Sequence, residues 1–101
     1  MQVEQRGSNE IIVTGNIKTL EDSNKIKDAI GRLVAHGSQN IHLEINDSFS
    51  MSSTVIGFLM KLVHHDKVQL SISVVDGRLY TLLDELCMVK IFNVRLVGQR
   101  E

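Results

Sequence analysis

The sequence contains no proline and only one cysteine, Cys87, among its 101 residues. A single cysteine excludes an intramolecular disulfide and is typical of proteins from a reducing compartment. The first residues lack the apolar core of a signal peptide, and no apolar run approaches the roughly 20 residues that a membrane-spanning helix needs. We therefore expect a cytoplasmic protein without membrane insertion.

Aromatic residues and dense charge are also scarce. The chain has three phenylalanines, one tyrosine and no tryptophan, and 11 basic side chains stand against 12 acidic ones. Proteins that bind nucleic acids usually carry a basic stripe or aromatic platforms on which bases stack. Because neither pattern is present, we expect no nucleic acid among the partners.

The common motifs of catalysis and of cofactor binding are missing as well. The sequence has no phosphate-binding glycine loop, no dinucleotide fingerprint and no paired-histidine zinc motif. His64 and His65 are adjacent, and neighbouring residues on a helix point about 100° apart, so they converge poorly on one metal ion. We expect no enzyme activity, no cofactor and no metal site.

The length fits a single domain over residues 1–101. Alternation of apolar and polar residues predicts strands, and apolar residues repeated every three or four positions predict helices. The expected strands are 1–5, 10–14, 41–45, 68–74 and 92–96, and the expected helices are 19–36, 53–65 and 79–86.

This order, β-β-α-β-α-β-α-β, predicts an α/β fold with a mixed sheet of four to five strands. Turn residues at 6–9 favour an antiparallel hairpin at the start, and the strand–helix–strand repeats that follow require parallel neighbours. The central strands alternate instead of being apolar throughout, so we expect the helices to pack mainly on one face of the sheet.

Short polar residues mark the helix ends. Thr19 can cap the first helix with Asp22 at the capping-box spacing, and Gly37 suits the position just after its end. Asp47 and Asp76 have the chemistry of turn residues. Cys87 adjoins the leucine stripe of the third helix, and because free cysteines are commonly buried, we expect it in the core.

The helix expected at 53–65 carries more apolar residues than one buried stripe needs. Either Ser52 or Ser53 can cap its N-terminus. The stripe predicted to face the core consists of Val55, Leu59, Leu62 and Val63. The surplus residues, which we expect to form an apolar surface patch beside Ser53, are Ile56, Phe58 and Met60.

The segment 41–57, Ile-His-Leu-Glu-Ile-Asn-Asp-Ser-Phe-Ser-Met-Ser-Ser-Thr-Val-Ile-Gly, resembles the STAS domain family, which includes the bacterial anti-sigma factor antagonists. Members carry a strand ending in Asp-Leu-Ser and, after a short loop, Asp-Ser-Ser-Gly-Leu-Gly at the start of a helix. Aligned without gaps, Glu44 falls on the first Asp and Gly57 on the last Gly. Ser52 replaces the acidic residue of the second motif, and Val55 replaces its first Gly.

A second patch supports the resemblance. The third helix of the family ends as Leu-x-x-x-Gly-Leu-x-x-x-Phe, and here Leu83 is followed at those positions by Cys87, Met88 and Phe92. The element order agrees over nearly the whole chain. We expect the C-terminal helix usual in the family to be missing or reduced to residues 98–101.

The resemblance implies a partner-switching regulator controlled by serine phosphorylation. The first Ser of the family's motif falls on Ser53, the target of a serine protein kinase that is also the anti-sigma factor; a PP2C-type phosphatase resets the switch. Thr54 and Ser52 are the second choices for the modification. The residues that would bind the partner are Ser52, Ser53, Thr54, Ile56, Gly57, Phe58 and Met60.

Other interpretations stay open at this point. Ser53 can serve only as a helix cap. The chain can be a constitutive, non-phosphorylated STAS-like subunit of a larger assembly, such as a transporter complex or a stress-sensing particle. It can also bind a small ligand or nucleotide at the same helix N-terminus, which favours anions.

Overall fold

The computed structural model describes residues 1–97, so the expectation for residues 98–101 lies outside the described residues. The element order is the predicted one, β-β-α-β-α-β-α-β. The strands are β1 (Gln2–Arg6), β2 (Glu10–Thr14), β3 (Asn40–Asn46), β4 (Gln69–Val74) and β5 (Val94–Leu96). The helices are α1 (Leu20–Ala35), α2 (Ser53–His64) and α3 (Gly77–Glu85).

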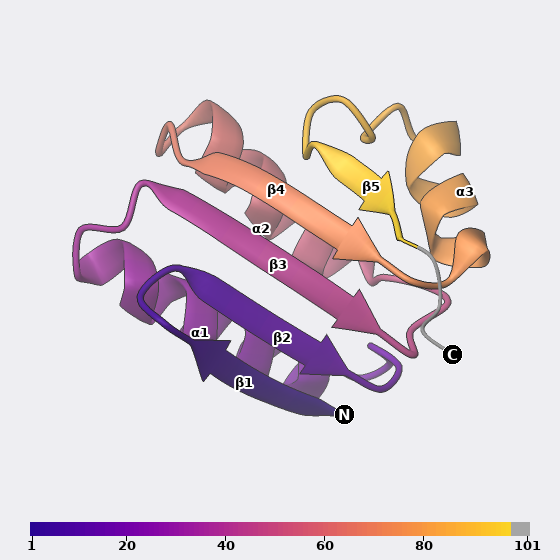
Figure 1. Cartoon of the computed structure of the whole chain (residues 1–101), viewed down its shortest axis with the longest axis horizontal. Helices are drawn as coiled ribbons and strands as arrows, with labels where there is room; N and C mark the ends of the chain where they lie inside the picture. Colours follow the sequence, from indigo (N-terminus) through magenta and orange to yellow (C-terminus); the bar gives the residue numbers. More distant parts are fainter. Residues whose placement is uncertain (98–101) are drawn as a thin grey trace.

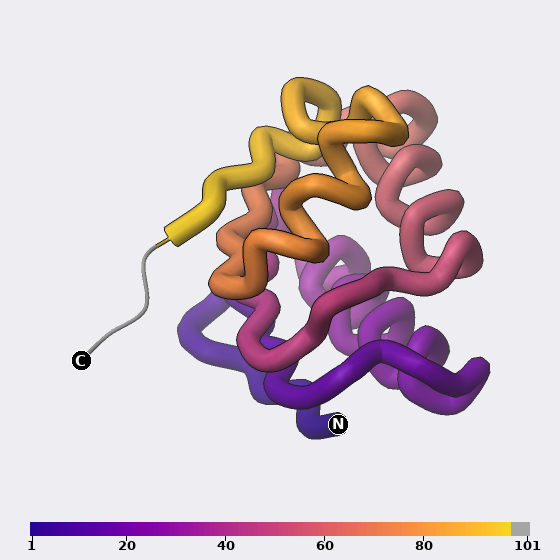
Figure 2. The backbone as a smooth tube through the Cα atoms, turned by 90° about the vertical axis from the view of Figure 1, so that its right-hand side faces the viewer, coloured from indigo at the N-terminus to yellow at the C-terminus, as the bar shows by residue number. Residues whose placement is uncertain are grey.

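The five strands form one mixed sheet in the order β1-β2-β3-β4-β5 (Figure 1). β1 and β2 make the expected antiparallel hairpin, and every later neighbour is parallel. Because each new parallel strand is added on the same side of the sheet, crossovers of the usual hand carry every helix to the same face. This confirms the predicted fold class, and Figure 2 shows the helices lying to one side of the sheet.

The core lies between the sheet and the helices. Alternate residues of β2, β3 and β4 point toward the helices, as the pleat requires, and they are almost fully buried. The sheet contributes Ile11, Val13, Ile41, Leu43, Ile45, Leu70, Ile72 and Val74 to this core. The helices contribute Ile26, Ala29, Ile30, Leu33, Val55, Leu59, Leu62, Leu79 and Leu83.

The other face of the sheet carries no helix in residues 1–97 and is mostly polar. Figure 1 looks onto this uncovered face, with α1 and α2 behind it and α3 at the edge near β5. The strand register places one set of side chains here: Gln2, Glu4, Arg6, Glu10, Ile12, Thr14, His42, Glu44, Asn46, Ser71, Ser73 and Arg95. Apart from Ile12 they are polar, which agrees with the alternation in the sequence.

The ends of α1 confirm two predictions. The Thr19 hydroxyl accepts a hydrogen bond from the Asp22 N–H, and the Asp22 carboxylate accepts one from the Thr19 N–H, which completes a capping box. At the other end Gly37 has a φ of 93°, and the N–H of the next residue, Ser38, donates to the Leu33 carbonyl. This is the hydrogen-bond pattern of a Schellman motif, which favours glycine.

The prediction that Cys87 lies in the core is wrong. Its side chain is exposed, and its backbone has a φ of 62°. The N–H of Cys87 donates to the Asp84 carbonyl and that of Met88 to the Leu83 carbonyl, so Cys87 occupies in α3 the place that Gly37 occupies in α1. The left-handed turn that ends the helix directs its side chain away from the leucine stripe.

Two element boundaries differ from the predictions. Asp76 is the N-cap of α3, where its carboxylate accepts a hydrogen bond from the Arg78 N–H, and α3 starts at Gly77, two residues earlier than expected. The last strand is shorter than expected and begins at Val94, because Asn93 takes a left-handed φ of 52°. Asp47, with a φ of 64°, is a turn residue as predicted.

Candidate functional site

The N-terminus of α2 distinguishes the roles of its two serines. Ser52 is the N-cap, and its Oγ accepts a hydrogen bond from the Val55 N–H at 3.2 Å. Ser53 is the first residue of the helix, and its side chain is exposed. The interpretation of Ser53 as the helix cap is therefore wrong, and its hydroxyl lies at the surface. Thr54 is exposed as well.

Ser52 also ties α2 to α1. Its Oγ lies 2.8 Å from the Oγ of Ser23, which is buried on the inner side of α1. The Ser23 hydroxyl can in turn donate to the Thr19 carbonyl at 3.3 Å. This chain of hydroxyls fixes the start of α2 against the start of α1, and it makes Ser52 a poorer acceptor of phosphate than Ser53.

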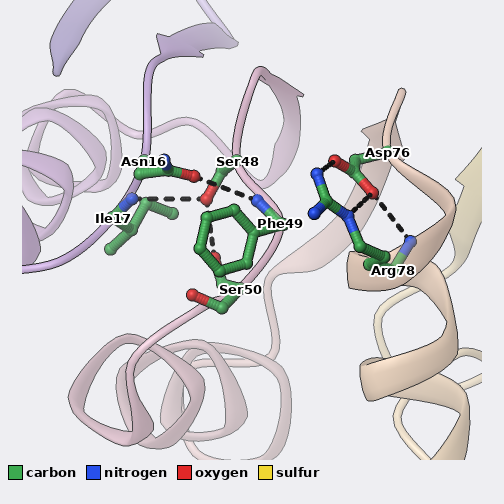
Figure 3. A network of polar contacts seen from close by, with 7 residues as sticks. All are labelled: Asn16, Ile17, Ser48, Phe49, Ser50, Asp76 and Arg78. Carbon is green, nitrogen blue, oxygen red and sulfur yellow. Dashed lines mark hydrogen bonds and ion pairs between the residues drawn. The ribbon is translucent and has the colours of Figure 1, made fainter.

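The loop before α2 is held by contacts that the sequence analysis missed (Figure 3). Ser48 is buried, accepts a hydrogen bond from the Ile17 N–H at 3.2 Å and donates to the Ser50 carbonyl at 2.6 Å. The N–H of Phe49 donates to the Asn16 side-chain carbonyl at 3.1 Å. The segment after β2 thus anchors the loop after β3. Nothing in the local sequence signals this pairing, since it depends on β2 and β3 being parallel neighbours.

An ion pair lies beside this loop, at the start of α3. The Arg78 guanidinium donates to both carboxylate oxygens of Asp76, at 3.0 and 2.6 Å, and lies 4.9 Å from the centre of the half-exposed Phe49 ring. The hydrogen bonds from the Arg78 side chain and backbone hold the pKa of Asp76 below its ordinary value of 3.8. Figure 3 shows Arg78 between Asp76 and Phe49, so that one arginine joins two loops at the same edge of the sheet.

The predicted apolar patch on α2 is divided in the structure. Ile56, Phe58 and Met60 are half-buried and pack against the core instead of standing free in water. Residues two apart on a helix lie about 200° apart around its axis, so Phe58 cannot share a flank with Ile56 and Met60. Phe58 lies on the side toward α1, where the Lys27 ammonium is 5.9 Å from its ring centre.

Four of the residues predicted to bind the partner lie together on α2. Ser53, Ile56, Gly57 and Met60 are spaced three or four apart and follow one side of α2, which we call the α2 stripe. A Cβ at Gly57 would meet no atom within 4 Å, so the middle of the stripe opens to the surface. The stripe is thus a shallow apolar strip with a hydroxyl at its N-terminal end, whereas Thr54 and Phe58 lie off it.

The charge around Ser53 favours an anion. The first N–H groups of α2 sit at the positive end of the helix dipole, and the first turn contains no acidic residue. The basic residues near the other end, Lys61 and His64, are placed where the dipole is negative. The local field would therefore accommodate a phosphate on Ser53 without opposing it.

The adjacent histidines at the end of α2, His64 and His65, lie at the surface. His65 is exposed and pairs with Asp66 through its Nδ1 at 3.0 Å, which agrees with an ordinary helix end. The strand order of residues 1–97 runs in one direction, so this sheet lacks the reversal at which open α/β sheets commonly bind nucleotides.

The residues that could hold a metal ion, Glu10, His42 and Glu44, lie on the uncovered face of the sheet.

Comparison with known proteins gives no further assignment: no protein-family model matches this sequence, and neither does any curated protein. The likeness to the STAS family therefore depends on the residues quoted above. Among residues 1–97, no helix combines the length and the apolar character needed to cross a membrane.

Proposed function

We propose that this protein is a STAS-type partner-switching regulator, a cytoplasmic protein that acts by binding other proteins and is controlled by phosphorylation of Ser53. The observation that carries the proposal is the position of Ser53: an exposed hydroxyl on the first residue of α2, at the head of the α2 stripe. Its partners would be a serine protein kinase that also acts as the anti-sigma factor, and a PP2C-type phosphatase.

The same modification has opposite effects on the fold and on the complex. A phosphate adds about −1.5 to −2 charges at neutral pH, which the N-terminal end of a helix stabilises. A partner that covers Ile56 and Met60 would have to bury that charge at the edge of an apolar contact. A loss of roughly 3 kcal/mol of binding free energy would lower the affinity about a hundredfold.

The test compares three variants of the purified chain for association with the ATPase-type serine kinases of its own organism. Ser53→Asp should weaken association about a hundredfold or more, and Ser53→Ala should retain it while abolishing phosphate transfer. Thr54→Asp is the matched control, because it adds the same charge to the same helical turn but lies off the α2 stripe. We expect it to bind nearly as the wild type does.

Stability measurements keep the test independent of misfolding. An acidic residue in the first turn of a helix is favourable by about 0.3–1 kcal/mol, so Ser53→Asp should unfold at an equal or higher urea concentration than the wild type. A variant that is more stable and yet binds less would identify the docking contact as the cause. Equal binding by Ser53→Asp and Ser53→Ala would remove the switch from the proposal.

The second candidate is a constitutive subunit of a larger assembly, such as a transporter complex or a stress-sensing particle. Ser52 favours it, because this residue stands where the family carries an acidic side chain and is committed to the cap and to Ser23. Intact mass spectrometry of the protein from its native host separates the two. A phosphorylated form mapped to Ser53 supports the switch, and its absence under every growth condition supports the assembly subunit.

A further inference from the structure

Three potential metal ligands meet on the uncovered face of the sheet. Glu10 and His42 are register partners on the parallel strands β2 and β3, and Glu44 follows two residues after His42 on the same face. One ligand atom from each of the three residues lies within 4.8 Å of those of the other two. All three side chains are half-buried. This places one imidazole nitrogen and two carboxylates around a common point on a rigid part of the sheet.

The imidazole of His42 is oriented by hydroxyls from the next strand. Its Nδ1 lies 2.7 Å from the Oγ of Ser71, and its Nε2 lies 3.1 Å from the Oγ of Ser73. In metal sites, a ligating histidine usually keeps a hydrogen bond on its other ring nitrogen, which fixes the orientation of the ring. If His42 exchanges one serine contact for a metal ion, the other serine keeps the ring in place.

Neither carboxylate makes an ion pair among residues 1–97, although Arg6 is the register partner of Glu10. The ion pairs among residues 1–97 are His65–Asp66 and Arg78–Asp76, so neither Glu10 nor Glu44 takes part in one. Glu44 only accepts a hydrogen bond from the Asn46 amide at 3.1 Å. The charged residues that share this face are Glu4, Arg6 and Arg95. Lys90 lines the same hollow as His42 and Arg95, so three carboxylates and three cationic side chains surround this part of the sheet.

We propose that Glu10, His42 and Glu44 form a binding site for a divalent transition metal ion of the zinc class. One imidazole and two carboxylates suit Zn²⁺, whereas Mg²⁺ and Ca²⁺ prefer ligand sets made only of oxygen. Three protein ligands on an open face leave the fourth position of a tetrahedral ion to water or to a group from a partner. The site goes beyond the proposed function and does not depend on it, because α2 lies on the opposite side of the sheet.

The experiment is a calorimetric titration with Zn²⁺ alone, made on the full chain carrying His65→Gln and Cys87→Ser. These two changes remove the exposed thiol and separate the adjacent pair of exposed imidazoles, so that His36 and His64 remain as single exposed histidines. We expect one site per chain. Glu10→Gln, His42→Gln and Glu44→Gln should each weaken binding by more than about tenfold. Of Ser71→Ala and Ser73→Ala, the change that removes the hydroxyl still holding the ring of His42 should weaken it by about 10–100-fold.

Glu4→Gln is the matched control: it removes a carboxylate from the same face, but Glu4 pairs with Ile12 and lies outside the cluster. It should bind Zn²⁺ as the parent does. Titration with Co²⁺ gives a second readout, since its visible absorption should show nitrogen and oxygen ligation in the parent and lose this signature in His42→Gln. Failure of the parent to bind, or equal weakening by Glu4→Gln and Glu44→Gln, would overturn the proposal.

Discussion

Cys87 shows how a single backbone conformation can outweigh side-chain preference. Its chemistry favours burial, but the Schellman motif at the end of α3 requires a left-handed residue at this position. Outside glycine, that conformation costs about 1–2 kcal/mol. The STAS pattern has glycine at the position of Cys87. The residue differs in this chain, but the left-handed turn that favours glycine is still formed.

A substitution to glycine tests this explanation. Cys87→Gly relieves the strain at the cost of a more flexible unfolded chain, and we expect it to raise the free energy of unfolding by up to about 1 kcal/mol in urea titrations. Cys87→Ser keeps the strain while removing the thiol and should leave stability nearly unchanged. If Cys87→Ser stabilises the protein as much as Cys87→Gly does, the thiol and not the turn is responsible.

Among the elements, α1 follows the signals at its ends more closely than α2 does. The capping box at Thr19 and the glycine at Gly37 are local features, and the structure confirms both. On α2 two adjacent serines were equally good caps, and only the contact with Ser23, which comes from another helix, assigns the role to Ser52. The division of the apolar patch followed from helical geometry alone and could have been predicted.

The caps of α1 and α3 give the protein an acid-sensitive part of its stability. Hydrogen bonds from the Lys18 and Thr19 N–H groups lower the pKa of Asp22, and those from Arg78 lower that of Asp76. Because both folded-state values lie below the ordinary value of 3.8, the unfolded chain binds protons first as the pH falls. At neutral pH both caps contribute fully to the free energy of unfolding. This contribution is lost as the pH falls below about 4 and passes through the folded-state pKa values of Asp22 and Asp76.

Urea unfolding at several pH values between 7 and 3 measures this effect. We expect the urea concentration at the denaturation midpoint to decrease once the pH is lower than about 4. In Asp76→Asn, which is less stable than the wild type at pH 7, this decrease should be less steep. Glu85→Gln, which changes an exposed carboxylate near the end of α3, should follow the wild type. An identical slope in Asp76→Asn and the wild type would show that the cap is not the titrating group.

At the scale of the whole molecule, the sequence predicted the layers of the fold but not the contacts between residues that lie far apart in the chain. Alternation in 41–45 and 68–74 correctly predicted one covered and one polar face. The contact of Asn16 with Phe49, and the meeting of Glu10 with His42, depend on which strands become neighbours and in what register. Without a glycine or cysteine motif to mark them, such pairs become visible only when the sheet is assembled.

The placement of the two proposed sites predicts that they act independently. The α2 stripe belongs to the helix layer, whereas Glu10, His42 and Glu44 lie on the face of the sheet that points away from it. Figure 2 shows that the helices lie to one side of the sheet. Free energies of well-separated sites usually add, so Ser53→Asp should leave the Zn²⁺ affinity within about twofold of the wild type. Calorimetry on both proteins checks this, and a larger change would indicate coupling through the sheet.

The one-directional order of the strands also bears on how the chain reaches this structure. Every strand pairs with the one that precedes it in the sequence, so each new helix and strand can settle on a surface that is already complete. The parallel pairs join residues 22 to 32 positions apart in the sequence, so we expect them to form more slowly than the local β1–β2 hairpin. On the ribosome, where synthesis proceeds from the N-terminus, the growing protein can add its units one after another without waiting for its last residues.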